Sequence, residues 1–468
     1  MDRFREECGV IGVWQHPEAS TLAYLGLHAL QHRGQEGAGI VSSDERSLYA
    51  HRGQGLVAEV FGRRESLQVL PGDRAIGHVR YSTAGESDLS SVQPLLVQHK
   101  GSRLAVAHNG NFVNAESLRA QLEAEGAIFQ SSTDTEIIVH LLARSRQSST
   151  VNRLVDALSR IKGAWTLLVI TPEHMIAARD PFGFRPLVLG QHPEGAWLVA
   201  SETCALDLVE ASYVRDIEPG EVVVFDRSGV ASFKPFPRQK THRCIFEHLY
   251  FARPDTSLWG QGVYEVRQRL GRQLARECPA EADYVLPVPD SGIAAALGYS
   301  LESEIPFQLG LVRNHYVGRS FIEPTQQIRD FGVKLKLNPL SHLLRGKRVV
   351  VIDDSLVRGT TCRKIIRMLR RARVAEVHLR IAAPPTKGSC FYGIDTPNPS
   401  ELIASGNEIS EIGRYVGADS IGYLSIGGMH AAVHDGSSGY CDACFSGRYP
   451  VEHEDLYKAP QLPLFDAD

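Results

Sequence analysis

The chain has 468 residues, of which 43% are hydrophobic and 22% charged, as in an ordinary globular protein of two or more domains. The net charge is −4, from 50 basic and 54 acidic residues, and no tract is rich in lysine or arginine, so nucleic acids and anionic membranes are poor candidates as partners. No apolar run reaches transmembrane length and the charged N-terminus lacks a signal-peptide core, so we expect a cytoplasmic protein. Eight cysteines in so long a chain do not suggest a disulfide framework, which leaves catalysis, metal binding or packing as their roles.

Short β-like runs dominate residues 8–235, in two groups around a few helices. The expected strands are Cys8–Trp14, Ala38–Ser42, Ala75–Arg80, Leu104–His108, Trp165–Thr171, Leu187–Leu189, Trp197–Ser201 and Val222–Phe225. The expected helices are Thr21–Gln31, Ala115–Glu125, Asp134–Arg144 and Val151–Ile161. This arrangement predicts an α+β layered domain.

The stretch 226–241 is interrupted by Gly, Pro and Ser, and we place a domain boundary after residue 235. A second domain, 242–450, alternates between strands and helices, which predicts an α/β domain with a mostly parallel sheet. Its expected elements are helix Tyr264–Arg276, strand Asp283–Val288, helix Gly292–Leu301, strand Arg348–Ile352, helix Thr361–Arg371 and strand Val377–Ala382. The acidic, proline-containing tail 451–468 is expected to be an extended arm or disordered.

Cys8 begins the first expected strand, where a cysteine is as readily a packing residue as a nucleophile. Four later segments each have an ordinary interpretation: a turn, a surface arginine, a hairpin and a helix cap. They are His32–Gly39, Gly77–Thr83, Ala107–Asn111 and Ser132–Glu136. Together with Asp180–Pro186 and Ser201–Thr203, they resemble the glutaminase domain of the class II glutamine amidotransferases, which has the layered α-β-β-α fold of N-terminal nucleophile enzymes.

The resemblance implies that a Cys8 thiolate attacks the side-chain amide of glutamine, with the Asn109 side chain and the Gly110 N–H as oxyanion hole. It also implies that Arg80 binds the α-carboxylate of glutamine and Asp134 its α-ammonium. The family uses the α-amine of the nucleophile as base, and such an amine titrates near neutrality. Residues 1–7 would then be a propeptide, removed by cleavage before Cys8.

Residues 349–361 carry a second signal, in which four apolar residues are followed by Asp353, Asp354 and a hydroxyl- and glycine-containing loop that opens a helix. Ligands of open α/β sheets bind at the carboxyl ends of strands, and helix N-termini bind phosphate. The two carboxylates suit hydroxyl groups or Mg²⁺. A βα turn with capping acids, or an acidic pocket of the receiver type, would give a similar pattern.

This order of residues resembles the phosphoribosyl pyrophosphate (PRPP) fingerprint of type I phosphoribosyltransferases. The resemblance implies that Asp353 and Asp354 contact the ribose hydroxyls directly or through one Mg²⁺. The 5-phosphate would be held by Ser355, Arg358, Gly359, Thr360 and Thr361. A second strand end, with Asp290, Ser291 and Gly292, suits the pyrophosphate, and Ser291 suits Mg²⁺, although alone it looks more like a turn with a helix cap.

Both domains in this order resemble the glutamine PRPP amidotransferases. Residues 313–321, which include Arg319, and 326–336 resemble the loop that closes over PRPP in that family. The resemblance implies that ammonia displaces pyrophosphate to give 5-phosphoribosylamine for purine synthesis. It also implies a closed passage between the sites with loop closure gating the glutaminase, purine nucleotides as feedback inhibitors, and a homotetramer.

Two other functions fit parts of the pattern. A different glutaminase-coupled synthase, aminating a sugar phosphate or aspartate, is disfavoured by the run Asp353–Thr361. A regulator that binds PRPP without catalysis is disfavoured by the presence of Cys8, Asn109 and Asp134.

Cys441 and Cys444 form a C-x-x-C pair, which alone could be a redox pair, half a zinc site or chance. Cys244 and Cys390 could complete a four-thiolate site, which suits Zn²⁺ as well as an iron–sulfur cluster. The set resembles the 4Fe-4S subclass of the amidotransferase family, which also carries a propeptide, and implies one structural cluster per subunit. Cys204, Cys278 and Cys362 are interpreted as packing residues.

Overall fold

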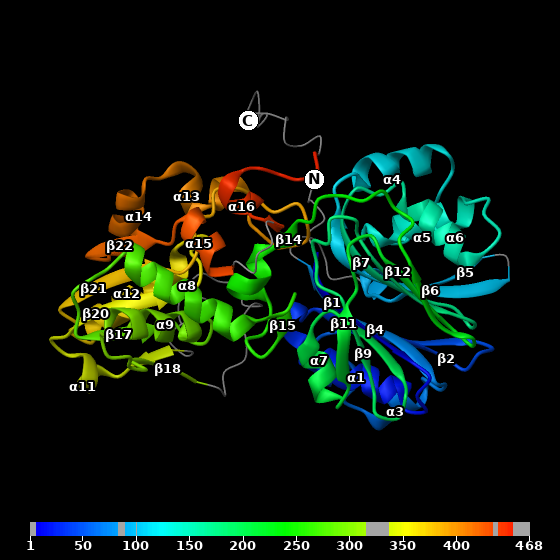
Figure 1. Cartoon of the computed structure of the whole chain (residues 1–468), viewed down its shortest axis with the longest axis horizontal. Helices are drawn as coiled ribbons and strands as arrows, with labels where there is room; N and C mark the ends of the chain where they lie inside the picture. Colours follow the sequence, from blue (N-terminus) through cyan, green and yellow to red (C-terminus); the bar gives the residue numbers. More distant parts are fainter. Residues whose placement is uncertain (1–5, 83–88, 100, 315–336, 434–438, 453–468) are drawn as a thin grey trace, which may run out of the picture.

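A computed structural model describes residues 6–82, 89–99, 101–314, 337–433 and 439–452. An N-terminal half with two stacked sheets lies beside a C-terminal half built on a parallel sheet, as Figure 1 shows from blue to red. Among the described residues, no helix has the length and apolar character needed to cross a bilayer.

The N-terminal half contains two antiparallel sheets, with strand orders β11-β9-β10-β1-β4-β2-β3 and β13-β12-β8-β7-β6-β5. Its strands are β1 (Glu6–Trp14), β2 (Gly37–Ser43), β3 (Leu48–Gln54), β4 (Arg74–Ser82), β5 (Leu95–His99), β6 (Ser102–Phe112), β7 (Gly163–Ile170), β8 (Met175–Arg179), β9 (Val188–Gln191), β10 (Trp197–Ala200), β11 (Ser212–Asp216), β12 (Val222–Asp226) and β13 (Gly229–Phe233). Its helices are α1 (Ala19–Ala29), η1 (Gln31–Arg33), α2 (Val57–Val60), α3 (Arg64–Gln68), η2 (Leu89–Ser91), α4 (Ala115–Ala124), α5 (Thr135–Arg144), α6 (Thr150–Leu158) and α7 (Thr203–Leu208).

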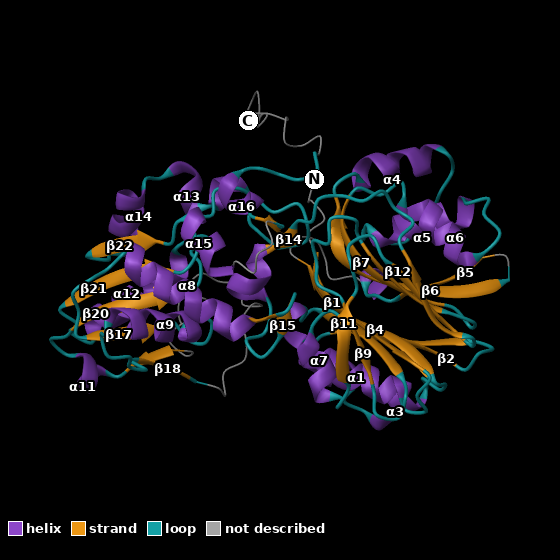
Figure 2. Ribbon diagram, viewed as in Figure 1, coloured by secondary structure: helices purple, strands orange, loops and turns teal. Residues whose placement is uncertain are grey.

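Side chains of β1 show why the half is layered. Val10 and Trp14 join the apolar core between the two sheets, whereas Ile11 and Val13 join the core beneath α1 and α7. A third core packs α4, α5 and α6 against the second sheet. Alternation with a period of two therefore buries both faces of β1 and produces the α-β-β-α order seen in Figure 2, which confirms the predicted fold class.

The expected strands and helices of this half all form, within a few residues at their ends. Five strands were not expected, namely β3, β5, β8, β11 and β13. Four of them are partly solvent-exposed and so lack a continuous apolar pattern, whereas β8 is fully buried but only five residues long. The stretch 226–241 begins with the hairpin between β12 and β13 and continues as irregular chain.

The C-terminal half has a four-stranded parallel sheet of order β17-β20-β21-β22. Its strands are β14 (Arg243–Cys244), β15 (Ser257–Leu258), β16 (Gln261–Gly262), β17 (Tyr284–Pro287), β18 (Leu311–Arg313), β19 (Leu337–Pro339), β20 (Arg348–Asp353), β21 (Glu376–Ile381), β22 (Ser420–Tyr423) and β23 (Tyr440–Cys441). Its helices are the π-helix η3 (Glu247–Phe251), α8 (Val263–Glu277), α9 (Ile293–Ser303), α11 (Ser341–Leu344), α12 (Thr360–Arg371), η4 (Pro399–Glu401), α13 (Ile403–Gly406), α14 (Ile409–Val416), α15 (Ile426–Val433) and α16 (Ala443–Ser446).

Two strand pairings outside that sheet matter for the sites. The short strands β18 and β19 pair antiparallel, so the chain that leaves at Arg313 returns at Leu337 beside it. β14 pairs parallel with β23, which joins the first and last parts of this half. The expected irregular tail begins later than residue 451, because Val451 is buried and its N–H donates to the Tyr392 hydroxyl over 3.0 Å.

Candidate active sites

Cys8 lies fully buried on β1, paired in register with Arg80 on β4. Its carbonyl accepts a hydrogen bond from Nε of Arg33 over 3.1 Å. β1 already begins at Glu6, and Glu7 pairs with Tyr81, so the chain preceding Cys8 continues the sheet. In this chain the backbone nitrogen of Cys8 is therefore a peptide nitrogen and not an amine.

The segment with Asn109 and Gly110 lies inside a strand, whereas the sequence suggested a strand end. β6 continues to Phe112, and Asn109 and Gly110 pair with Thr166 and Trp165 on β7. Gly110 has φ 151°, and a Cβ there would lie 2.1 Å from the carbonyl oxygen of Ala164, so only glycine fits.

The Asn109 side chain is fully buried, and neither its Oδ1 nor its Nδ2 has a hydrogen-bond partner among the described residues. A buried polar atom without a partner costs about 1–3 kcal/mol, and such atoms are uncommon in folded proteins. The Asn109 amide is therefore available to a ligand.

Histidines connect β4 and β6 beside Asn109. Nε2 of His78, two residues before Arg80, lies 3.0 Å from the carbonyl oxygen of His108. Burial lowers the pKa of His78 to about 3, so its ring is neutral and donates this hydrogen bond through Nε2. The two sheets are thus joined at the point where Arg80 and Asn109 lie.

Asp134 immediately precedes α5 but makes no side-chain capping bond, contrary to the simple helix-cap interpretation. Its carboxylate instead accepts the backbone N–H of Phe112 over 2.9 Å and lies 3.3 Å from Nδ1 of His108. Asp134 is therefore attached to the end of the strand that carries Asn109. The structure thus places Asn109, Gly110 and Asp134 together, with Cys8 and Arg80 on the sheet that His78 joins to them.

The segment His32–Gly39 packs against β4 for a steric reason. A Cβ at Gly34 would lie 2.6 Å from the backbone nitrogen of Arg80, so the loop can approach this strand only as glycine. The same loop carries Arg33, whose side chain contacts the Cys8 carbonyl and which the sequence analysis did not single out.

The second site lies at the adjacent carboxyl ends of β17 and β20. Asp353 ends β20, and the N–H of Asp354 donates to its Oδ1 over 3.1 Å. The Ser355 hydroxyl donates to Oδ1 of Asp354 over 2.7 Å, and Ser291, in the turn between β17 and α9, also hydrogen-bonds Asp354. The three residues expected at Mg²⁺, Ser291, Asp353 and Asp354, are therefore brought together.

Burial and the neighbouring Asp354 carboxylate raise the pKa of Asp353 well above its ordinary value. Burial also raises the pKa of Asp354, against hydrogen bonds from Ser291 and Ser355 that lower it. Two acids that are both hard to ionise together favour a bound cation, because a divalent ion compensates both charges.

The helix α12 begins directly after the carboxylates. Gly359 has φ 73° at its N-terminal cap, and Thr360 and Thr361 form its first, exposed turn. Arg358 is exposed and pairs with Glu401 over 2.7 Å. At the other strand end, Asp290 pairs with Arg313, and Gly292 precedes α9. Arg319 lies outside the described residues.

One contact in this site was missed from the sequence. Cys362, interpreted as packing, is buried and its thiol donates to Oδ2 of Asp353 over 3.3 Å. It lies one turn into α12, next to the threonines, and its position directly after the glycine–threonine run was the available signal. The Cys204 thiol lies near the Ala29 carbonyl and the Glu202 carboxylate, and the Cys278 thiol donates to the Tyr423 carbonyl over 3.5 Å.

The four cysteines of the expected cluster surround one cavity of about 40 Å³, where roughly 10–15 Å³ suffices for a water. Cys244 and Cys441 are register partners on β14 and β23, Cys444 lies on α16, and the Cys390 sulfur accepts the N–H of Tyr392 over 3.3 Å. Burial raises the pKa of the Cys244 thiol to about 12, although Arg185 lowers it. None of the eight cysteines forms a disulfide.

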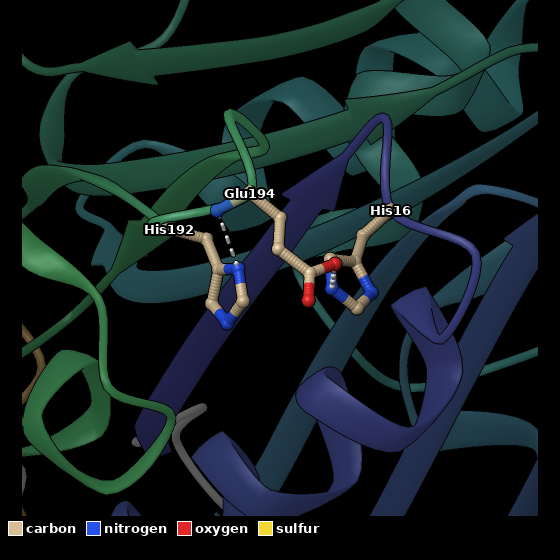
Figure 3. A group of neighbouring side chains, drawn as sticks. All are labelled: His16, His192 and Glu194. Carbon is tan, nitrogen blue, oxygen red and sulfur yellow. Dashed lines mark hydrogen bonds and ion pairs between the residues drawn. The ribbon is translucent and has the colours of Figure 1, made fainter.

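A separate group, His16, His192 and Glu194, has ligand atoms within 4.8 Å of one another, and Figure 3 shows Glu194 between the two rings. Nδ1 of His16 accepts the N–H of Glu18 over 3.0 Å, and Nδ1 of His192 accepts that of Glu194 over 3.2 Å. In a neutral ring, Nε2 then carries the proton. Metal binding through Nε2 would require the other tautomer, with the proton on Nδ1. We interpret the group as a hydrogen-bonded cluster, with His16 buried and Glu194 exposed, and not as a metal site.

Models of two families match the chain. One, described as a glutamine amidotransferase domain, matches residues 78–208, and the other, a phosphoribosyl transferase domain, matches residues 261–391. The fold and both sites therefore define a glutamine amidotransferase joined to a phosphoribosyltransferase.

Relatives that match nearly the whole chain identify the protein family more specifically than the two domain models do. The chain is 53% identical to a chloroplastic amidophosphoribosyltransferase of Glycine max, over 97% of this chain and 79% of the relative, and 48% identical to that of Bacillus subtilis, over 98% and 96%. A solved B. subtilis glutamine PRPP amidotransferase in complex with ADP and GMP superposes with a TM-score of 0.90 at 47% identity, covering 96% of this chain and 98% of the other. The chain belongs to the amidophosphoribosyltransferase family, whose members are pentosyltransferases.

Proposed function

We propose that this enzyme hydrolyses glutamine at Cys8 and passes the ammonia to PRPP at Asp353 and Asp354. In the first step the thiolate attacks the glutamine amide, ammonia leaves, and water hydrolyses the thioester to glutamate. In the second, ammonia displaces pyrophosphate from the ribose to give 5-phosphoribosylamine. The observation that carries the first step is the buried Asn109 amide, which has no hydrogen-bond partner in the described part of the chain, next to the glycine-only position 110.

The substrate contacts follow from charge. Glutamine is a zwitterion, and the site offers the buried cation Arg80 to its α-carboxylate and the buried anion Asp134 to its α-ammonium. The Asn109 side chain and the Gly110 N–H are proposed to stabilise the negative oxygen that forms on attack. Such donors act strongly because the site is buried and its groups are held by strands.

The base of the first step is proposed to be the α-amine of Cys8 itself. This requires removal of residues 1–7, because β1 now runs through Cys8 from Glu6. We expect the intact mass of active enzyme to lack these seven residues. An active enzyme that retains Met1 would contradict this base.

At the second site, Mg²⁺ is proposed to be held by Ser291, Asp353 and Asp354. Their oxygens are the ligands that Mg²⁺ prefers, and the ion would neutralise the charge of the leaving pyrophosphate. We assign the 5-phosphate to the N-terminal turn of α12, with Ser355, Arg358, Gly359, Thr360 and Thr361. We assign the pyrophosphate to the turn with Asp290, Ser291 and Gly292, and Arg319 to the wider set of PRPP contacts.

The four-cysteine site is proposed to hold a structural 4Fe-4S cluster. All four cysteines line one cavity. Four thiolates suit Zn²⁺ as well as an iron–sulfur cluster, and the resemblance to the cluster-containing subclass favours the cluster. Iron and sulfide near four each per chain are expected, and zinc in their place would contradict the cluster.

Regulation is proposed to use purine nucleotides as feedback inhibitors, on the basis of the relative solved with ADP and GMP. We also propose a homotetramer. Both are testable by inhibition of PRPP turnover and by the mass of the assembly in solution.

The decisive experiment compares glutamine and ammonia as nitrogen donors, with PRPP and Mg²⁺, in wild type and Cys8→Ala. We expect the variant to lose glutamine-dependent synthesis and keep ammonia-dependent synthesis, because the thiol serves only the first step. Cys278→Ala is the matched control, since Cys278 lies outside both sites. Loss of both routes with the fold intact, or of neither, would contradict the two-site assignment.

A further inference from the structure

Four fully buried charged side chains lie at the junction of the two halves. Arg33, Arg185 and Glu202 come from the N-terminal half and Glu247 from the C-terminal half. Two cations face two anions, so the group is balanced in formal charge. Burying charges is costly unless they are paired, so what matters for function is which groups these ion pairs hold in place.

Glu247 is connected to Cys8 through a single side chain, that of Arg33. It accepts two hydrogen bonds from the Arg33 guanidinium, over 2.7 Å from Nη2 and 3.1 Å from Nη1. The same guanidinium donates through Nε to the Cys8 carbonyl, and it also pairs with Glu202. The planar Arg33 guanidinium can therefore fix the Cys8 backbone only while its two terminal nitrogens are also bound by carboxylates.

Glu247 belongs to an unusual secondary-structure element. Glu247 begins the π-helix η3, in which the N–H of Ala252 donates to the Glu247 carbonyl over 3.0 Å. Phe251, at the other end of η3, packs its ring 4.4 Å from the centre of the Arg33 guanidinium and 5.1 Å from that of Arg185. π-helices are rare and often occur at functional sites.

Arg267, buried on α8, holds the π-helix η3 from within its own half. It donates to the carbonyl of His248 over 2.9 Å and to that of Ala252 over 2.7 Å. One arginine therefore fixes η3 near both of its ends, and with it the position of Glu247.

We propose that Glu247 is a positioning residue of the glutaminase reaction, supplied by the phosphoribosyltransferase half. Its carboxylate holds the Arg33 guanidinium, which in turn holds the Cys8 carbonyl. The proposal rests on the assignment of Cys8 as the nucleophile above.

The first test is Glu247→Gln. The glutaminase kcat is expected to fall by about 10- to 100-fold, as small misplacements of reacting groups do. The KM for glutamine should change little because Glu247 touches no substrate, and ammonia-dependent synthesis should be kept. Glu302→Gln is the matched control, since it removes a two-bonded arginine pair from the surface of the same half. An unchanged kcat, or equal loss by both routes, would overturn the proposal.

A charge imbalance could also explain a loss in Glu247→Gln, and a double variant separates the two causes. Arg185→Gln with Glu247→Gln removes one charge of each sign. If the double variant recovers the glutaminase, only charge balance mattered and Glu247 is not a positioning residue. If the loss persists while ammonia-dependent synthesis continues, Glu247 acts through Arg33.

The second test follows the rate at which a diazoketone analogue of glutamine alkylates Cys8. Glu247→Gln is expected to slow this alkylation, and Glu302→Gln to leave its rate unchanged. Equal rates in wild type and Glu247→Gln would overturn the positioning role. Absence of alkylation at Cys8 in wild type would instead contradict the nucleophile assignment.

Discussion

The two candidate sites of this enzyme are built in opposite ways. The glutaminase side chains Cys8, Arg80, Asn109 and Asp134 are all at most 5% exposed and come from strands of two sheets and the start of a helix. The PRPP site combines two buried carboxylates with exposed residues such as Arg358 and Thr360 at a helix N-terminus. A small zwitterion can be enclosed by fixed groups, whereas a polyanion needs backbone N–H groups, cations and a metal at an open edge.

This difference predicts which reaction each substitution affects. The glutaminase site is arranged in advance around an unsatisfied amide, so its losses should appear in one route only. The PRPP site serves both nitrogen donors, so its losses should appear in both.

After loss of the nucleophile itself, the largest expected effect is that of Asn109→Ala on the glutaminase. Removal of one oxyanion-hole donor costs about 10²–10³ in rate, and ammonia-dependent synthesis should stay at the wild-type level. Steady-state glutaminase assays with both donors measure this, with the exposed Asn152→Ala on α6 as control. A comparable loss with ammonia would show that Asn109 supports the fold and not the oxyanion.

Asp354→Asn is expected to impair synthesis from glutamine and from ammonia alike. Mutation of a residue that only orients a metal ligand lowers metal affinity or activity by about 10–100-fold. Loss of a proposed ligand should therefore lower activity by at least that much. Titration with Mg²⁺ in the ammonia assay should show a raised requirement for the ion. Asp255→Asn, at an exposed pair with Arg253, is the control. Normal PRPP turnover in Asp354→Asn would exclude its role.

Stability without metal should depend on pH through Asp353. Its pKa is raised in the folded state, so the folded protein binds more protons than the unfolded chain above pH ~4. The contribution of Asp353 to stability is complete below its pKa in the unfolded chain. It is lost as the pH rises through its pKa in the folded protein. In EDTA, Asp353→Asn should therefore gain on the order of 1 kcal/mol over wild type near pH 8 and little near pH 4. Denaturant unfolding at both pH values measures this, and a gain that does not grow with pH would contradict it.

The smallest expected effect is that of the thiol on Asp353. Cys362→Val removes the donor to Oδ2, worth about 0.5–1.5 kcal/mol, and should change the Mg²⁺ requirement by a few-fold. Cys362→Ser keeps a donor at this position and should resemble wild type. Equal behaviour of the valine and serine variants would assign Cys362 to packing, as the sequence first suggested.

One part of the proposed PRPP site, residues 349–361, could be laid out from the sequence because its residues are contiguous. A buried strand, two acids, a glycine and a helix start occupy 349–361, and local geometry alone places the acids beside the helix N-terminus. The fold class followed from equally local signals, namely alternation in one half and strand–helix alternation in the other. The strands that escaped prediction are mostly exposed ones, which bury too few side chains to leave a pattern.

The glutaminase site could be named from the sequence only by resemblance, because its residues are spread from Cys8 to Asp134. Only the tertiary structure placed Asn109 inside a strand, turned Asp134 from a helix cap into an acceptor for Phe112, and joined Arg33 to Glu247 of the other half. Sequence determines elements through short-range periodicity and turn chemistry. Contacts between residues more than 200 positions apart depend on how those elements pack, and that information is held by no single segment of the chain.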